Sequence, residues 1–336
     1  MITPGPKNSI TDIPGLKVGN AQDASIRTGV TVLLGDAPFQ AVVDVRGAAP
    51  GTRDCDTLRG PGMGLPVEAI TLSGGSIYGL DAPGGVIARL NEMGRGVAYD
   101  DGVAPLPLVP GAILYDLGNG GDKNWGDAPP YRNLGRMAAQ NAARDFILGN
   151  AGAGYGARAG AYKGGLGSAS AVTGDGITVG ALVAVNAVGS PVIPGTECFW
   201  AHLFEQNGEF GGLRPDGRQI DLDLPHDLKS SPAIAANTTI AIIATDAALS
   251  RNALQQLAVM ATDGFAHALR PVHTPFDGDL VFAVTTGAKP VAESEANAVL
   301  RLGMIAADTL ARAIARGVYE AQSLGGYVSY REHFGV

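Results

Sequence analysis

The stretch Asn237-Thr-Thr-Ile-Ala-Ile-Ile-Ala-Thr245 joins a polar segment to a run of β-branched and small apolar residues. Such a run is typical of a strand, so a strand is predicted over 238–245. The preceding segment, 208–232, is polar and rich in charge, which favours an exposed loop. Asn237 and Thr238 therefore stand where an exposed loop is expected to meet a strand.

This position suggests a chemical role for Thr238. A threonine hydroxyl is a poor nucleophile unless a base lies beside it. Cutting the chain just before Thr238 would supply one, because a free α-amine has a pKa of about 7.7–8.0 and can take the proton of its own side chain. We interpret Asn237–Thr238 as a self-cleavage junction and Thr238 as an N-terminal nucleophile. The alternative is a plain strand start, since threonine favours strands.

Composition limits the class of protein. The chain has 336 residues, of which 46% are hydrophobic and 17% charged, so a sizeable core can be buried. Glycine, at 49 residues, is about twice as frequent as usual, which indicates tight turns and close backbone approaches. The net charge of −8 argues against a nucleic-acid partner, because phosphate binding needs a basic face.

Targeting signals are not evident. The N-terminal segment lacks the pattern of a signal peptide, and no apolar stretch has the length of a membrane span. Two cysteines, Cys55 and Cys198, are too few for a disulfide framework and are expected to be reduced. The sequence therefore predicts a cytoplasmic protein with no membrane partner.

Strands and helices mix without a repeating βαβ rhythm, which favours an α/β layered sandwich over a doubly wound parallel sheet. We expect one domain over 1–336, in which strands 28–34 and 41–45 pair around a turn at 35–38. The other predicted strands are 69–73, 177–188 and 280–286, and the predicted helices are 77–93, 134–148, 250–269 and 294–322.

The acidic turn Asp277-Gly-Asp279 precedes the last strand. One carboxylate could hold the amine of Thr238 while the other orients the first, although a simple Asx turn is the alternative. His273 lies near this turn and is a functional candidate. The other histidines show no metal-ligand spacing, and no motif for a nucleotide or serine hydrolase is present, so neither metal nor cofactor is expected.

Three further residues are candidates for the site. Asn186 is an amide in an apolar strand, where it needs a partner and could donate to an oxyanion. Lys163 is a lone lysine among small residues; it is either a surface lysine or, if buried near a reacting group, a means to steady an oxyanion. Tyr115 lies at a strand end. It is either a residue of the site or a side chain that packs in the core.

These features resemble those of a known family, the L-aminopeptidase/D-amino-acid amidase-esterases, which also contains β-aminopeptidases and nylon-oligomer hydrolases. The resemblance runs from Ile10 to about Tyr330. Its most specific parts are Val43–Arg53, Ser73–Asp81, Gly156–Gly165, Asn237-Thr-Thr and Arg270–Asp279. It implies a four-layer αββα sandwich like that of N-terminal-nucleophile hydrolases, and cleavage into chains 1–237 and 238–336 that stay together.

Carried over position by position, the resemblance makes Thr238 the nucleophile and Asp277 and Asp279 its supporting carboxylates. The aminopeptidase members cleave before a serine, whereas Asn237–Thr238 is similar to the junction of nylon-oligomer hydrolases. This departure puts the aminopeptidase label in doubt without establishing a nylon substrate.

By the same resemblance, Asn186 is an oxyanion donor, and Lys163 and Tyr115 line the site. The implied activity is metal-free hydrolysis of small peptides or amino-acyl amides, with 6-aminohexanoate oligomers among the candidates, in a homo-oligomer, expected to be a tetramer. The rival hypotheses are an acyltransferase of the ornithine acetyltransferase type and a non-enzymatic binding protein.

Overall fold

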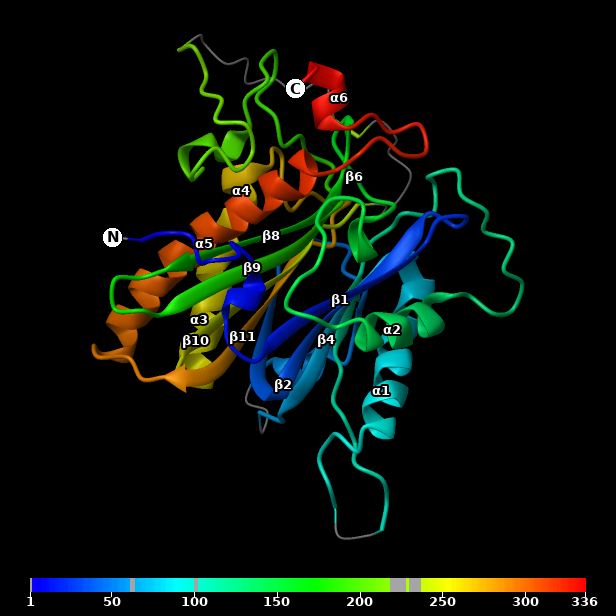
Figure 1. The fold of residues 1–336 in the computed structure, drawn as a ribbon, viewed down its shortest axis with the longest axis vertical. Coiled ribbons are helices and arrows are strands. Elements are labelled where there is room, and N and C mark those ends of the chain that lie inside the picture. Colours follow the sequence, from blue (N-terminus) through cyan, green and yellow to red (C-terminus); the bar gives the residue numbers. More distant parts are fainter. Residues whose placement is uncertain (1, 61–63, 100–101, 218–227, 230–236) are drawn as a thin grey trace.

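The computed structural model describes residues 2–60, 64–99, 102–217, 228–229 and 237–336 (Figure 1). The strands are β1 Leu16–Asp23, β2 Thr28–Val45, β3 Thr52–Arg53, β4 Val67–Ser73, β5 Gly111–Ile113, β6 Arg158–Ala159, β7 Tyr162–Lys163, β8 Gly165–Val172, β9 Thr178–Val185, β10 Ile240–Ala247 and β11 Leu280–Lys289. The α-helices are α1 Ala82–Glu92, α2 Tyr131–Gln140, α3 Arg251–Ala261, α4 Asp263–Ala268, α5 Glu295–Tyr319 and α6 Tyr330–Phe334.

One long strand, β2, organises the sheet. In the described residues the strand order is β3-β5-β4-β2-β11-β10-β9-β8, with β1 also paired to β2. Residues 28–34 of β2 pair with β1 and β4, whereas residues 40–45 pair with β11. The prediction that the two halves of β2 pair with each other is therefore wrong. Each half has different neighbours, and the turn-like residues 36–38 are an exposed part of the strand, where its pairing with β4 shifts register.

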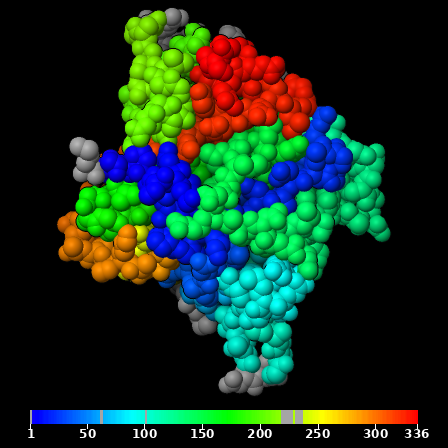
Figure 2. All heavy atoms as spheres, in the orientation of Figure 1, coloured from blue at the N-terminus to red at the C-terminus, as the bar shows by residue number. Residues whose placement is uncertain are grey.

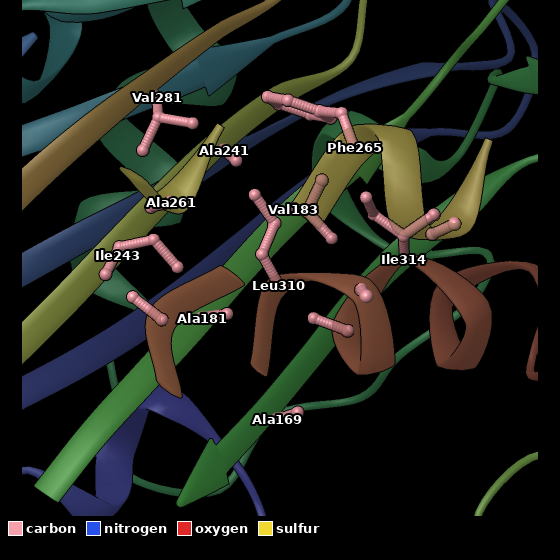
Figure 3. Close-up of a cluster of buried hydrophobic side chains, with 14 of the residues drawn as sticks. Ala169, Ala181, Val183, Ala241, Ile243, Ala261, Phe265, Val281, Leu310 and Ile314 are labelled. Atoms are coloured by element: carbon pink, nitrogen blue, oxygen red, sulfur yellow. The ribbon is translucent and has the colours of Figure 1, made fainter. Parts of the chain in front are cut away.

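The sheet folds over at β2 into two layers with helices on both outer faces (Figure 1). One buried cluster lies between the layers and includes Leu33, Leu72, Leu182 and Phe282. A second cluster joins β8–β11 to α3, α4 and α5 (Figure 3). A third cluster joins the opposite layer to α1 and α2. The predicted αββα sandwich is confirmed.

Strand alternation sets the faces of β10. Ile240 and Ile242 belong to the cluster between the layers, while Ala241 and Ile243 belong to the cluster under the helices. Because successive side chains of a strand point to opposite faces, the same alternation turns Thr238 toward the space between the layers and Thr239 toward the helices.

Some helix boundaries agree with the prediction and others differ from it. Ser250 and Ser294, the first residues of two predicted helices, are the N-caps of α3 and α5, and the side chain of each accepts a backbone N–H of the first turn. The helix predicted over 134–148 ends at Gln140, and the one predicted over 250–269 divides at Thr262. None of the helices among the described residues is long and apolar enough to cross a membrane.

Candidate active site

Thr238 lies at the start of a central strand, where three segments meet. Strands β10 and β11 are parallel, so Thr238 and the acidic turn reach the same edge of the sheet, and Asn237 forms a bridge with Asp277. Strand β9 is antiparallel to β10, so Asn186, which follows β9, reaches that edge as well. Residues far apart in sequence are thereby brought together, as a common site requires.

The Thr238 hydroxyl lies against the peptide bond that precedes it. Its Oγ1 donates to the backbone carbonyl oxygen of Asn237 and accepts from the backbone N–H of Gly278 at 3.2 Å. Thr238 is only 4% exposed. The predicted nucleophile and the predicted scissile carbonyl are therefore adjacent in a site from which bulk water is largely excluded.

Asn186 contacts Thr238 through its backbone. The Thr238 N–H donates to the Asn186 carbonyl at 2.9 Å. The Asn186 side-chain amide instead donates to the backbone carbonyl of Tyr115 at 3.0 Å, and its Oδ1 accepts from the Arg158 backbone N–H at 3.0 Å and from Lys229 Nζ at 3.1 Å. Tyr115 is thus joined to the site through its main chain, and the amide predicted to face an oxyanion is engaged elsewhere in the intact chain.

Asp277 is held in place by three donors. Its Oδ2 accepts from the backbone N–H of Thr274 at 2.9 Å and from the Thr274 hydroxyl at 2.6 Å, and its Oδ1 accepts from the Val188 N–H at 3.3 Å. Burial, and then the charge of Asp279, raise the pKa of Asp277. The negative charge of Asp279 therefore disfavours ionisation of Asp277.

Asp279 connects the junction to His273. Its Oδ1 accepts from the backbone N–H of Thr239 at 2.7 Å. Its Oδ2 accepts from the backbone N–H of His273 at 3.1 Å and lies 3.0 Å from Nδ1 of the same residue. Among the described residues, the nitrogen of Thr238 itself is paired with the Asn186 carbonyl and not with either carboxylate. The acidic turn thus holds the main chain around the nucleophile.

Residues 8–331 match Peptidase family S58. The chain belongs to this family.

Its S58 relatives include aminopeptidases and amide hydrolases. A protein of Mycobacterium tuberculosis (strain ATCC 25618 / H37Rv), named an uncharacterised aminopeptidase, is 44% identical over 97% of this chain and 98% of its own length. A 6-aminohexanoate-oligomer endohydrolase of Kocuria sp. (strain KY2) is 31% identical over 82% of this chain and 74% of its own length. The predicted family and the enzyme class, a hydrolase acting on C–N bonds, are confirmed.

Solved structures of similar fold support the architecture. A Burkholderia sp. β-aminopeptidase covers 98% of this chain and 92% of its own, with 23% identity and a TM-score of 0.70. The L-aminopeptidase D-Ala-esterase/amidase of Ochrobactrum anthropi, described as a new variant among the Ntn hydrolase fold, covers 99% and 96%, with 20% identity and a TM-score of 0.69. At these identities the likeness shows that the S58 chain shares their fold.

Lys163 of this S58 chain is fully buried, so the surface-lysine alternative is wrong. Its Nζ donates to the carbonyls of Gly154 at 3.0 Å and Gly164 at 2.6 Å. Burial lowers the pKa of Lys163 to about 7, and the negative charge of Asp116 acts in the opposite direction. Asp116 is itself buried, and burial raises its pKa to about 6.

A pH-dependent stability is expected from Lys163. Burial lowers the pKa of Lys163 from its usual 10.5 to about 7 on folding, so between these pH values the unfolded state binds more protons and stability rises with pH. The Lys163→Met variant should lose this part of the rise, on the order of a few kcal/mol, since one pKa unit corresponds to about 1.4 kcal/mol. Denaturant unfolding of both proteins from about pH 7 to about pH 10 measures the difference in slope. Equal slopes would contradict a buried, neutral lysine.

Two site residues were not found from the sequence. In the sequence, Gly278 is only the middle residue of the acidic turn Asp277-Gly-Asp279. In the structure, its backbone N–H contacts the hydroxyl of Thr238. Lys229 lies in the polar loop before the junction, most of which is outside the described residues. Burial and the nearby Arg158 lower the pKa of Lys229 to about 7, against the opposing effect of Asp277. No local pattern distinguishes this lysine from an ordinary loop residue.

One sizeable cavity lies away from Thr238, which is not among its lining residues. It has a volume of about 590 Å³ and is lined by residues 193–198, 213–216, 333 and 334, together with Tyr162. These segments meet at the top of the molecule, where light green and red surfaces adjoin in Figure 2. Among the described residues, no three His, Cys, Asp or Glu side chains gather in a way that could hold a metal ion.

Proposed function

We propose that this S58 hydrolase activates itself by cleaving Asn237–Thr238 and then uses Thr238 to hydrolyse amides. The observation that carries the proposal is the contact of Thr238 Oγ1 with the carbonyl of Asn237 in a buried site. A nucleophile held against a carbonyl gains from proximity, because the reacting groups need not find each other.

The self-cleavage proceeds in two steps. The Thr238 oxygen bonds to the carbonyl carbon of Asn237, the C–N bond breaks, and the hydroxyl proton is transferred, directly or by relay, to the departing nitrogen. The product is an ester with a free Thr238 amine. Water then adds to the ester carbon, the C–O bond breaks, and Asn237 becomes a carboxylate while Thr238 regains its hydroxyl.

The mature Thr238 would carry its own base. Its α-amine takes the hydroxyl proton while the oxygen attacks a substrate amide, and it returns the proton to the leaving amine. The Asn186 carbonyl, which accepts the Thr238 N–H at 2.9 Å before cleavage, is placed to orient this amine afterwards. Water hydrolyses the resulting acyl-enzyme and releases the acid. Asp277 and Asp279 orient the main chain at both sides of the nucleophile.

The topology supports two chains that remain associated. The proposed small chain, 238–336, contributes β10 and β11, and these strands lie between β9 and β2 of the large chain. Cutting at Asn237 leaves every one of these strand pairings in place, because the cut precedes β10. The fragments would therefore share one sheet and one core.

The substrate class follows from the family and from the chemistry of the site. We propose small peptides or amino-acyl amides, including 6-aminohexanoate oligomers, because relatives are named as aminopeptidases and as a 6-aminohexanoate-oligomer endohydrolase. Release of free acid without acyl transfer to added amines would separate a hydrolase from an acyltransferase.

Both cysteines are free and buried, which supports a reducing cytoplasm as the location. The tetramer stays a prediction, which light scattering can test.

The proposal is tested by the intact mass of the purified protein. We expect two fragments, 1–237 and 238–336, whose summed mass exceeds that of the uncut chain by one water. Terminal sequencing of the small fragment should find Thr-Thr-Ile-Ala. Fully active protein that consists of a single uncut chain would overturn the mechanism.

A further inference from the structure

The backbone N–H of Gly278 faces both reacting groups of the proposed self-cleavage. It lies 3.0 Å from the carbonyl oxygen of Asn237 and 3.2 Å from Thr238 Oγ1. Both distances are in the range of hydrogen bonds, so the donor is shared between the scissile carbonyl and the nucleophile. Asn237 and Thr238 are each 4% exposed, so this contact is shielded from solvent.

The absence of a side chain at Gly278 is what permits this approach. A Cβ at this position would lie 2.8 Å from Thr238 Oγ1 and 2.6 Å from the carbonyl oxygen of Ala49. The acidic turn is also fixed by a second backbone hydrogen bond, in which the Ala49 N–H donates to the Asp277 carbonyl at 2.9 Å. The donor is therefore fixed in position before any reaction takes place.

The side-chain amide of Asn186 was predicted to donate to an oxyanion. Among the contacts of the described residues, it does not contact the carbonyl oxygen of Asn237 in the intact chain. Its Nδ2 donates to the Tyr115 carbonyl, and Asn186 meets Thr238 through its own carbonyl, which is an acceptor. An acceptor cannot stabilise the negative oxygen that forms when a carbonyl is attacked. The carbonyl oxygen of Asn237 accepts from the Gly278 N–H instead.

We propose that the Gly278 N–H is the oxyanion donor of the self-cleavage at Asn237–Thr238; this inference rests on the proposed function. As the Thr238 oxygen bonds to the Asn237 carbon, the carbonyl electron pair moves onto its oxygen, which the Gly278 N–H already contacts. A donor aimed at developing charge in a water-poor site lowers the barrier without reorganisation. When the C–N bond breaks, the carbonyl re-forms and the departing nitrogen takes the proton.

Two variants test the donor. Gly278→Ala keeps the N–H but adds a Cβ that must displace the turn or the Thr238 hydroxyl, so cleavage should slow. Replacing Gly278 with glycolic acid exchanges the N–H for an ester oxygen and adds no side chain. Loss of one oxyanion donor typically slows a reaction by about 10²–10³-fold, and this slowing is expected for the ester variant. The readout is the fraction of uncut full-length chain over time, with circular dichroism as a check of folding.

Thr239→Ala is the matched control, because it alters only the side chain of the next residue. The Thr239 hydroxyl has no hydrogen-bond partner among the described residues, and strand alternation turns it away from the face of Thr238. This variant should cleave at the wild-type rate. A folded ester variant that also cleaves at that rate would overturn the role of Gly278 while leaving self-cleavage intact. A wild-type chain that never cleaves would instead remove the proposed function itself.

Hydroxylamine locates the affected step, because it cuts the ester intermediate without needing the second, hydrolytic step. Fragments are assigned by mass, because hydroxylamine also cuts the ester that this variant carries between residues 277 and 278. If Gly278 assists the first attack, hydroxylamine should not restore cleavage between Asn237 and Thr238 in the ester variant, since little intermediate forms. Restoration to the wild-type rate would place the defect after the attack and would contradict the proposal.

Discussion

Replacing Thr238 with alanine is expected to leave the chain whole and without amidase activity. The substitution removes the oxygen that contacts the Asn237 carbonyl. It should cost little folding stability, because the β-propensity scale spans only about 1 kcal/mol. Mass spectrometry should find one uncut chain, and assays with amino-acyl amides should find no released acid. This is the largest effect that the proposed mechanism predicts.

Two companion variants separate a chemical role of Thr238 from a structural one. Thr238→Ser keeps a hydroxyl and should still cleave, more slowly, with some activity. Thr239→Ala should process normally, because alternation along the strand turns its hydroxyl to the opposite face. If Thr238→Ala still splits after Asn237 and still hydrolyses amides, the nucleophile lies elsewhere.

The second large effect is expected at the acidic turn. Asp277 and Asp279 accept hydrogen bonds on both carboxylate oxygens. An Asp→Asn substitution places an NH₂ group against one of these donors and removes the charge, so it should displace the main chain next to the nucleophile. Loss of a preorganised electrostatic partner commonly slows a reaction by about 10²–10³-fold, and each single variant should lose cleavage or turnover to this extent.

An exposed carboxylate supplies the control for this experiment. Asp145 is paired with Lys7, and its side chain is 84% exposed, so Asp145→Asn should change neither cleavage nor turnover. Rates are compared at equal folded fraction, measured by thermal unfolding. Near-normal activity in both single variants of the turn would reduce Asp277 and Asp279 to a structural role.

Local patterns in the sequence predicted much of the fold. The strand predicted over 238–245, the helix starts at Ser250 and Ser294, and the strand that begins near Ile177 all follow from residue type and spacing, which act over a few neighbouring residues. The same patterns, together with the family resemblance, pointed to Thr238 and to the acidic turn. These features could be predicted from the sequence because each depends on a short stretch of the chain.

The tertiary structure decided the rest, because contacts between distant residues depend on strand register and packing. The sequence of β2 reads as two strands, and only its separate neighbours make it one strand that joins two layers. The sequence leaves open whether Lys163 is a surface or a buried lysine, and only the surrounding packing shows that it is buried. The direction of the Asn186 amide depends on Tyr115, 71 residues away in the chain. The contact of Gly278 with Thr238 likewise arises only because β10 and β11 are parallel neighbours, which places the residues that precede them side by side.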